Sequence, residues 1–134
     1  MRLYFDSSAI VKLVQAATET EALRRFIGLY PDDGLVTSAL AHVEVLRGAA
    51  RAGHVAVERA RDELVKFDQL AIDVALLERA AVLLPSRRLR SLDAIHLASA
   101  ELLGVELRAV VTYDQRMAEA AAALGLIVEA PAPG

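Results

Sequence analysis

The sequence predicts a three-layer α/β/α fold with a short, mostly parallel sheet, and three observations support this fold class. Short apolar runs alternate along the chain with segments of helical periodicity, as expected for strands that are buried on both faces. Helix-capping residues directly follow some of these runs, for example Asp6-Ser7-Ser8 after Leu3–Phe5. The 134 residues are 55% hydrophobic and include no cysteine, so one core can form without disulfides or thiolate-bound metals.

The strands of this sheet are expected where apolar or β-branched runs end at turn or capping residues. In chain order the predicted strands are Leu3–Phe5, Leu35–Thr37, Leu70–Ile72, Ala109–Thr112 and Leu126–Val128. Because ligands bind parallel sheets beyond the carboxyl ends of the strands, functional residues are expected at that edge.

Capping residues and glycines set the expected bounds of the helices. Thr18 and Glu21 have the spacing of a capping box, Ser91 is expected to cap a strong helix, and Gly104 is expected to close it. In chain order the predicted helices are Ala9–Val14, Thr18 to before Pro31, Ser38 to Gly53, His54–Phe67, Asp73 to near Pro85, Leu92–Leu103, and the alanine-rich segment that ends at Ala123.

A chain of this length corresponds to one domain at about 100 to 200 residues per domain. We expect that domain to span residues 1–129 and the tail Ala130–Gly134 to be flexible, extended and unpacked. Only three apolar residues separate Arg2 from Asp6, and no apolar run is long enough to span a bilayer, so a cytoplasmic protein with no membrane partner is expected.

The net charge of −3 means that the molecule as a whole would not attract nucleic acid. Any phosphate-binding surface must therefore be local. The polar segment Ser86–Arg90 contains three arginines and is expected to form a basic loop.

Four acidic residues are expected near the carboxyl edge of the sheet. Asp6 and Asp114 follow predicted strands, Asp93 lies in the first turn of its helix, and Glu44 lies about two turns into the helix after Leu35–Thr37. Each has an ordinary alternative explanation, because an aspartate at a helix start serves as a cap or complements the helix dipole and Glu44 alone fits a solvated helix.

The apolar neighbours of these acids favour a shared site. Two unit charges about 5 Å apart repel by roughly 3 kcal/mol at an effective dielectric of 20, so several uncompensated acids would destabilise the fold. A divalent cation would remove this penalty, and oxygen ligands favour Mg²⁺ or Mn²⁺ over zinc. Such an ion polarises a phosphodiester and activates water, so the predicted chemistry is hydrolytic phosphoryl transfer.

Several motifs together resemble the PIN-domain family, and specifically its VapC-type toxin ribonucleases. The match spans nearly the whole chain in order, and Leu-Asp-Ala-Ile-His-Leu-Ala is its most specific part. The segments that carry it are Asp6–Lys12, Glu44–Arg47, Leu89–Ala100 and Val110–Met117.

The resemblance implies an Mg²⁺- or Mn²⁺-dependent endoribonuclease that acts as the toxin of a type II toxin–antitoxin pair. It makes residues 1–129 a single PIN-like nuclease domain that hydrolyses RNA phosphodiester bonds with a metal-activated water. It also implies a homodimer and a small DNA-binding antitoxin of the VapB type, whose C-terminal segment occupies the active-site groove.

The family's functional positions can be carried over residue by residue. Those that match its acidic quartet are Asp6, Glu44, Asp93 and Asp114, of which Asp6, Asp93 and Asp114 are the expected metal ligands. Ser8 and Thr112 match its hydroxyl positions, which hold a metal-bound water or a neighbouring carboxylate. Some relatives carry a further acid where this chain has Arg116, so we expect one tightly bound metal and a weaker second completed by RNA phosphate.

Basic residues near these motifs are candidates for RNA binding. Arg87, Arg88 and Arg90 precede the Asp93 helix and are placed to contact phosphates, with a solvated loop as the alternative. Lys12 and Arg47 are further candidates for phosphate contact, with a surface position as the alternative for Lys12 and a pair with Glu44 as the alternative for Arg47.

His96 and two alternative functions also have to be considered. His96 lies amid apolar residues and fits a satisfied core position better than a general base. A phospho-accepting receiver domain also gathers acids at a sheet edge, but here Ser7 follows Asp6 and no lysine ends the last strand. A catalytically silent PIN fold that only binds a partner is the third possibility, and the intact quartet disfavours it.

Overall fold

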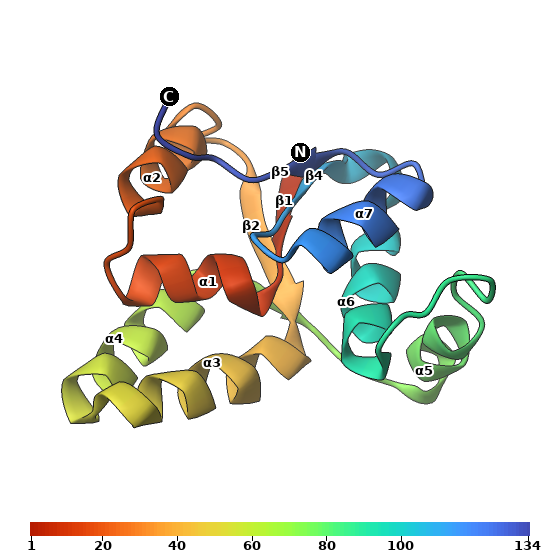
Figure 1. The fold of residues 1–134 in the computed structure, drawn as a ribbon, viewed down its shortest axis with the longest axis horizontal. Helices are drawn as coiled ribbons and strands as arrows, with labels where there is room; N and C mark the ends of the chain where they lie inside the picture. Colours follow the sequence, from red (N-terminus) through yellow and green to blue (C-terminus); the bar gives the residue numbers. More distant parts are fainter.

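A five-stranded sheet divides the molecule into two helical layers in the computed structural model, which describes residues 1–134 (Figure 1). Its strands are β1 (Arg2–Phe5), β2 (Gly34–Ser38), β3 (Asp68–Leu70), β4 (Leu107–Val111) and β5 (Val128–Glu129). They pair in the order β3-β2-β1-β4-β5, and every pair is parallel. The predicted three-layer fold with a short parallel sheet is therefore confirmed.

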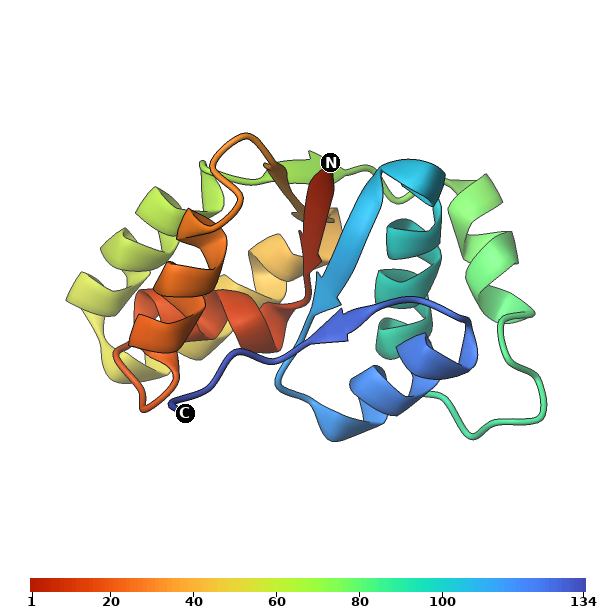
Figure 2. The ribbon, with the colours of Figure 1, turned by 90° about the horizontal axis from the view of Figure 1, so that it is seen from above.

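The helices are divided between the two faces of this sheet (Figure 2). They are α1 (Ser7–Val14), α2 (Thr20–Gly28), α3 (Ala39–Ala52), α4 (His54–Leu64), α5 (Val74–Ala81), α6 (Ser91–Glu101) and α7 (Gln115–Ala123), with a 3₁₀ turn η1 at Gly104–Glu106. Helices α1 to α4 share one core with β1 and β4, while α6 and α7 pack on the opposite face. Helix α5 covers the outer side of α6.

The central strand β1 shows why its sequence is an uninterrupted apolar run. Leu3 and Phe5 belong to the core on the α1 side, whereas Tyr4 belongs to the core on the α6 side. All three side chains are fully buried. Successive side chains of a strand point to opposite faces, so in a strand covered on both sides no side chain faces solvent and every position favours an apolar residue.

Three of the predicted N-caps are present as expected. The side chains of Asp6, Ser38 and Asp73 accept hydrogen bonds from backbone N–H groups at the starts of α1, α3 and α5. Gly53 ends α3 and begins α4 with φ of 111°, a left-handed conformation that favours glycine. Local capping chemistry thus fixes where the chain leaves the sheet edge.

Two predicted N-caps are wrong. Helix α2 begins at Thr20, not Thr18, because the Thr20 hydroxyl donates to the carbonyl of Lys12 and accepts from the N–H of Ala17. Helix α6 begins with Ser91 as its first helical residue, and Arg90 takes the N-cap position without a side-chain cap. Tertiary contacts of Thr20 and Arg90 override the local signals.

Several element bounds also differ from the predicted ones. Strand β3 pairs with β2 through Asp68–Leu70 instead of Leu70–Ile72, and β5 is Val128–Glu129 instead of Leu126–Val128. Helices α4, α5 and α6 end earlier than expected, at Leu64, Ala81 and Glu101. Gly104 has φ of 53° and starts η1 instead of closing α6.

The C-terminal tail makes one defined contact with the domain. The Tyr113 hydroxyl donates a hydrogen bond of 2.7 Å to the carbonyl of Pro131. The tail was expected to be unpacked, but this contact joins it to the domain. Both ribbon views show the chain end lying near α2 (Figures 1 and 2). No helix has the length and apolar composition needed to cross a membrane.

Candidate active site

Asp6 lies where β1 ends, with its side chain held entirely by neutral donors. Its Oδ1 accepts hydrogen bonds from the Ala9 N–H at 3.1 Å and the Ser8 hydroxyl at 2.7 Å, and its Oδ2 accepts from the Thr112 hydroxyl. The residue is only 3% exposed. Burial raises the pKa of Asp6 above its usual value, and the hydroxyl donors oppose that rise.

Ser8 and Thr112 join the ends of β1 and β4 around this carboxylate. The Ser8 hydroxyl accepts from the N–H of Tyr113 at 2.9 Å, and the Thr112 hydroxyl accepts from the N–H of Asp114 at 3.1 Å. Each hydroxyl therefore donates to Asp6 and accepts from the β4 edge. The two hydroxyl positions act on a neighbouring carboxylate in this arrangement, one of the two roles expected of them.

Glu44 projects from α3 and is held by two donors on different elements. Its Oε1 accepts from the Ser7 hydroxyl on α1 and from Nε2 of His96 on α6, the latter at 2.8 Å. Burial opposes ionisation, but the hydrogen bonds from His96 and Ser7 hold the pKa of Glu44 below its usual value. The Glu44 carboxylate is therefore charged and fixed in orientation at neutral pH.

Tyr4 completes this chain of hydrogen bonds from inside the core. Its hydroxyl lies 2.8 Å from Nδ1 of His96, and burial raises the pKa of Tyr4 well above its usual value. A tyrosine that keeps its proton donates to Nδ1, which leaves the His96 proton on Nε2 to be donated to Glu44. His96 is the satisfied, buried residue that was expected, but its contact with the acidic site was not predicted, nor were the roles of Tyr4 and Ser7.

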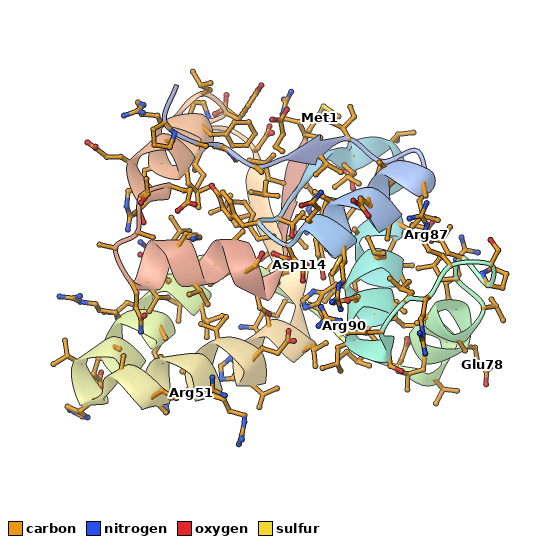
Figure 3. The ribbon with its side chains drawn as sticks, in the orientation of Figure 1. Met1, Arg51, Glu78, Arg87, Arg90 and Asp114 are labelled. Atoms are coloured by element: carbon orange, nitrogen blue, oxygen red, sulfur yellow. The ribbon has the colours of Figure 1, made fainter.

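Arg90 links the two remaining acids. Its Nε donates to Oδ2 of Asp93 at 2.7 Å, and its Nη2 donates to Oδ2 of Asp114 at 3.0 Å. Asp93 lies in the first turn of α6 and is 8% exposed, and Oδ1 of Asp114 caps α7 through the N–H groups of Arg116 and Met117. Figure 3 shows Arg90 and Asp114 next to each other between α3, α6 and α7. Arg90 thus gives these two acids positive charge of the kind that was expected from a divalent cation.

The four acids lie around one sheet edge, but their immediate partners keep them apart. Hydroxyls surround Asp6, an imidazole meets Glu44, and a guanidinium lies between Asp93 and Asp114. No three carboxylate or imidazole side chains are close enough to hold a metal ion together in this arrangement. The expected ligand set of Asp6, Asp93 and Asp114 is not assembled here, because Arg90 bridges two of its members.

The chemistry of the donors nevertheless fits a hard divalent cation. All four acids offer carboxylate oxygens, the ligands that Mg²⁺ and Mn²⁺ prefer. Asp6 is buried with its hydrogen bonds supplied only by neutral groups, so its charge has no cationic side chain as a partner. A cation that replaced Arg90 between Asp93 and Asp114 would face oxygens alone.

The other basic candidates occupy different surroundings. Arg87 and Arg88 are exposed and, with Arg90 and Arg116, line a cleft that borders Asp93. Lys12 is instead paired with Glu19 at 3.0 Å. Arg47 is exposed on α3 and makes no ion pair with Glu44, whose partners are Ser7 and His96. Arg116, which stands where some relatives were expected to carry an acid, thus belongs to the basic cleft.

Comparison with known proteins adds an independent finding. The family model described as PIN domain matches residues 3–123. The chain is 47% identical to "Ribonuclease VapC46" of Mycobacterium tuberculosis H37Rv, covering 96% of this chain and 97% of that protein. It is 39% identical to "Ribonuclease VapC35" of the same species, covering 96% of each.

Solved structures show the same fold. The crystal structure of Mycobacterium tuberculosis VapC20, described as a sarcin-ricin loop cleaving toxin, superimposes with a TM-score of 0.71 at 20% identity, over 93% of this chain and 96% of that one. A toxin–antitoxin complex from Klebsiella pneumoniae gives a TM-score of 0.69 at 23% identity, over 87% and 88% of the two chains. The VapBC2 structure from Rickettsia felis, bound to a promoter DNA fragment, gives 0.71 at 12% identity, over 96% and 98%.

Proposed function

This chain belongs to the PIN-domain family and is of the VapC type, and from that premise we propose that it is a divalent-cation-dependent endoribonuclease that cleaves RNA phosphodiester bonds. The observation that carries the proposal is the placement of four carboxylates around the carboxyl edge of a parallel sheet. Relatives at 47% and 39% identity are named ribonucleases, which supports the same chemistry.

The metal ligands of this proposal are Asp6, Asp93 and Asp114. A bound Mg²⁺ or Mn²⁺ supplies positive charge that stabilises the phosphoryl group in the transition state and lowers the pKa of water. Ser8 and Thr112 fix the direction of the Asp6 carboxylate, because each donates a hydrogen bond to it. Preorganised ligands of this kind do not have to be reoriented when substrate binds.

Glu44 has the role of orienting the attacking water. Its Oε1 is occupied by Ser7 and His96, whereas its Oε2 makes no hydrogen bond within the protein. Glu44 also lines a small cleft together with Asp93 and Arg90. An ionised carboxylate with one oxygen fixed presents the other as an acceptor in a defined direction, which suits it to hold and orient a water at Oε2.

The RNA phosphates bind in the cleft lined by Arg87, Arg88, Arg90 and Arg116, which we call the arginine cleft. Arg87, Arg88 and Arg116 have no carboxylate partner, so their guanidinium groups remain available for phosphate oxygens. The cleft borders Asp93, and it therefore places a bound backbone beside the acids. Lys12 and Arg47 would contact RNA only further from this cleft.

A receiver domain fits the structure less well. Flavodoxin-like receivers have the strand order 2-1-3-4-5, whereas this sheet has the order β3-β2-β1-β4-β5. A silent PIN fold that only binds a partner would not need the hydrogen bonds from Ser8 and His96 that orient Asp6 and Glu44.

Cleavage of a structured RNA tests the proposal directly. The wild-type protein is expected to cut the RNA with Mg²⁺ or Mn²⁺ and to lose activity with EDTA. Asp93→Asn should abolish cutting, and Glu44→Gln should slow it by about 10²- to 10⁴-fold. Asp62→Asn, an exposed carboxylate on α4, is the matched control that should cut normally. Cleavage that persists both in EDTA and in Asp93→Asn would contradict the proposal.

The partner is a small DNA-binding antitoxin of the VapB type, and the active form of the toxin is a homodimer. Structures similar to this one include a toxin–antitoxin complex and VapBC2 bound to promoter DNA, which support an antitoxin partner. Co-expression with the product of the adjacent reading frame should give a stable complex and restore growth that the toxin alone arrests. Light scattering of the isolated protein should give twice the mass of the 14.4 kDa chain.

A further inference from the structure

Arg90 holds two catalytic acids that are distant in the sequence. Its two guanidinium contacts, at 2.7 Å to Asp93 and 3.0 Å to Asp114, both end on Oδ2 atoms. The two carboxylates lie on α6 and at the start of α7, so the contact also joins two helices. Contacts of this length between a guanidinium and a carboxylate are charge-assisted hydrogen bonds.

The position of Arg90 makes this contact easy to exchange. Its side chain is 58% exposed and extends from the loop that precedes α6, whereas Asp93 is largely buried. Exposed ion pairs are individually weak, because water solvates both groups when they separate. The guanidinium also borders the arginine cleft, where Arg88 and Arg116 leave space for a phosphate. Arg90 therefore has a second place to interact once it leaves the acids.

Arg90 and a divalent cation cannot bind the two carboxylates at the same time, so the cation has to displace Arg90. One guanidinium gives a single positive charge to two carboxylates, and a divalent cation gives two charges from a smaller volume. Both would use the same Oδ2 atoms and repel each other at that distance. The Glu44 carboxylate nearby adds negative charge and attracts either cation.

We infer that Arg90 is the resident counter-cation of this site: it holds Asp93 and Asp114 together and competes with a divalent cation for these two carboxylates. The inference rests on the proposed function only in taking these acids as the cation's ligands. When the cation binds, Arg90 is released toward the arginine cleft, where an RNA phosphate is its next partner. Cation binding and phosphate binding then favour each other, and this coupling is reciprocal.

Titration of MnCl₂ into the protein without RNA tests the competition, with isothermal calorimetry as the readout. Arg90→Gln should bind Mn²⁺ about fivefold or more tightly than the wild type, since couplings between sites commonly fall between 5- and 150-fold. Its melting temperature without added cation should fall, and Mn²⁺ should raise it by more than in the wild type. Arg90→Lys keeps the charge but lacks the planar guanidinium whose Nε and Nη2 contact the two acids, so its affinity should lie between the two.

Arg79→Gln is the matched control. Arg79 is a similarly exposed arginine on α5 that pairs with Glu101 at 3.2 Å, away from the acids. This variant should bind Mn²⁺ like the wild type. Equal or weaker Mn²⁺ binding by Arg90→Gln, in a variant whose circular dichroism shows a folded protein, would overturn the inference, as would a failure of both proteins to bind Mn²⁺.

A parallel RNA cleavage assay separates this inference from the proposed function. Normal wild-type cleavage with an unchanged Mn²⁺ affinity in Arg90→Gln would refute the competition and leave the ribonuclease proposal standing. Tighter Mn²⁺ binding by Arg90→Gln without any RNA cleavage by the wild type would support the competition and refute the ribonuclease.

Discussion

The Tyr4 hydroxyl is the part of the hydrogen-bond chain behind Glu44 that can be removed with the least change in shape. Tyr4→Phe keeps the buried ring in the core and deletes only the group that donates to Nδ1 of His96. His96 is itself buried, so its Nδ1 would lose its protein partner without gaining water. Leaving a buried polar atom unsatisfied costs about 1 to 3 kcal/mol.

The stability change should be visible by both urea and heat. For a domain of this size each kcal/mol corresponds to roughly 3 to 5 °C in melting temperature. A second readout is the tautomer of His96 in nitrogen-detected NMR, which we expect to be the Nε2–H form in the wild type. Tyr4→Phe should lower the population of that form, because the hydrogen bond to Glu44 is then the only contact that favours the proton on Nε2.

Tyr30→Phe is the control for loss of a hydroxyl. The Tyr30 ring packs against Phe26 and Arg108, and its hydroxyl holds no other side chain in place. Its removal should change the unfolding free energy by less than about 0.5 kcal/mol. If Tyr4→Phe were as mild as Tyr30→Phe and left the His96 tautomer unchanged, the proposed role of the Tyr4 hydroxyl in fixing His96 would be refuted.

Three further predictions concern stability away from the acids. The hydrogen bond from Arg108 holds the pKa of Asp33 below its usual value, so Asp33 stabilises the fold above about pH 4 and loses that effect as the pH falls through its folded-state pKa. In Asp33→Asn, the free energy of unfolding in urea should therefore depend less on pH in that range. The same pH dependence in the variant and the wild type would contradict this. Asp73→Ala removes the cap that binds the N–H of Leu76 and should cost about 0.5 to 2 kcal/mol in urea unfolding with RNA cleavage unchanged. Leu97→Ala, at a fully buried position, should cost about 2 to 5 kcal/mol, and a smaller loss would mean that the core closes the cavity.

Much of the fold could be predicted because its signals are local. The apolar run Leu3–Phe5 and the caps Asp6, Ser38 and Asp73 each depend on a few adjacent residues, and all are present in the structure. Local signals failed at Thr18, since the hydroxyl of Thr20 binds the backbone of α1 instead. The strand order β3-β2-β1-β4-β5 has no local signal at all, because it depends on which strands share a core.

The candidate site divides in the same way. The positions of the four acids relative to the predicted strands indicated that they lie near one edge of the sheet, which is the edge where parallel sheets bind ligands. The contact between Tyr4 and His96 spans 92 residues of sequence, and that between His96 and Glu44 spans 52. Such pairs follow from the packing of α6 against β1 and α3, so neither composition nor spacing could have predicted them.

Only one of the two contacts of Arg90 could be predicted from the sequence. Repulsion among the acids correctly indicated that positive charge is needed, and the spacing of three residues between Arg90 and Asp93 favours a pair within one helical turn. The second contact, with Asp114, depends on how α6 and α7 pack, and it supplies positive charge that the sequence alone would lead one to expect from a metal. Because Arg90 supplies positive charge to Asp93 and Asp114, the protein can fold without a bound divalent cation. In the proposed exchange, the affinity for Mg²⁺ or Mn²⁺ is the free energy of binding the cation less that of displacing Arg90. A substitution at Arg90 should therefore change that affinity without changing a proposed metal ligand.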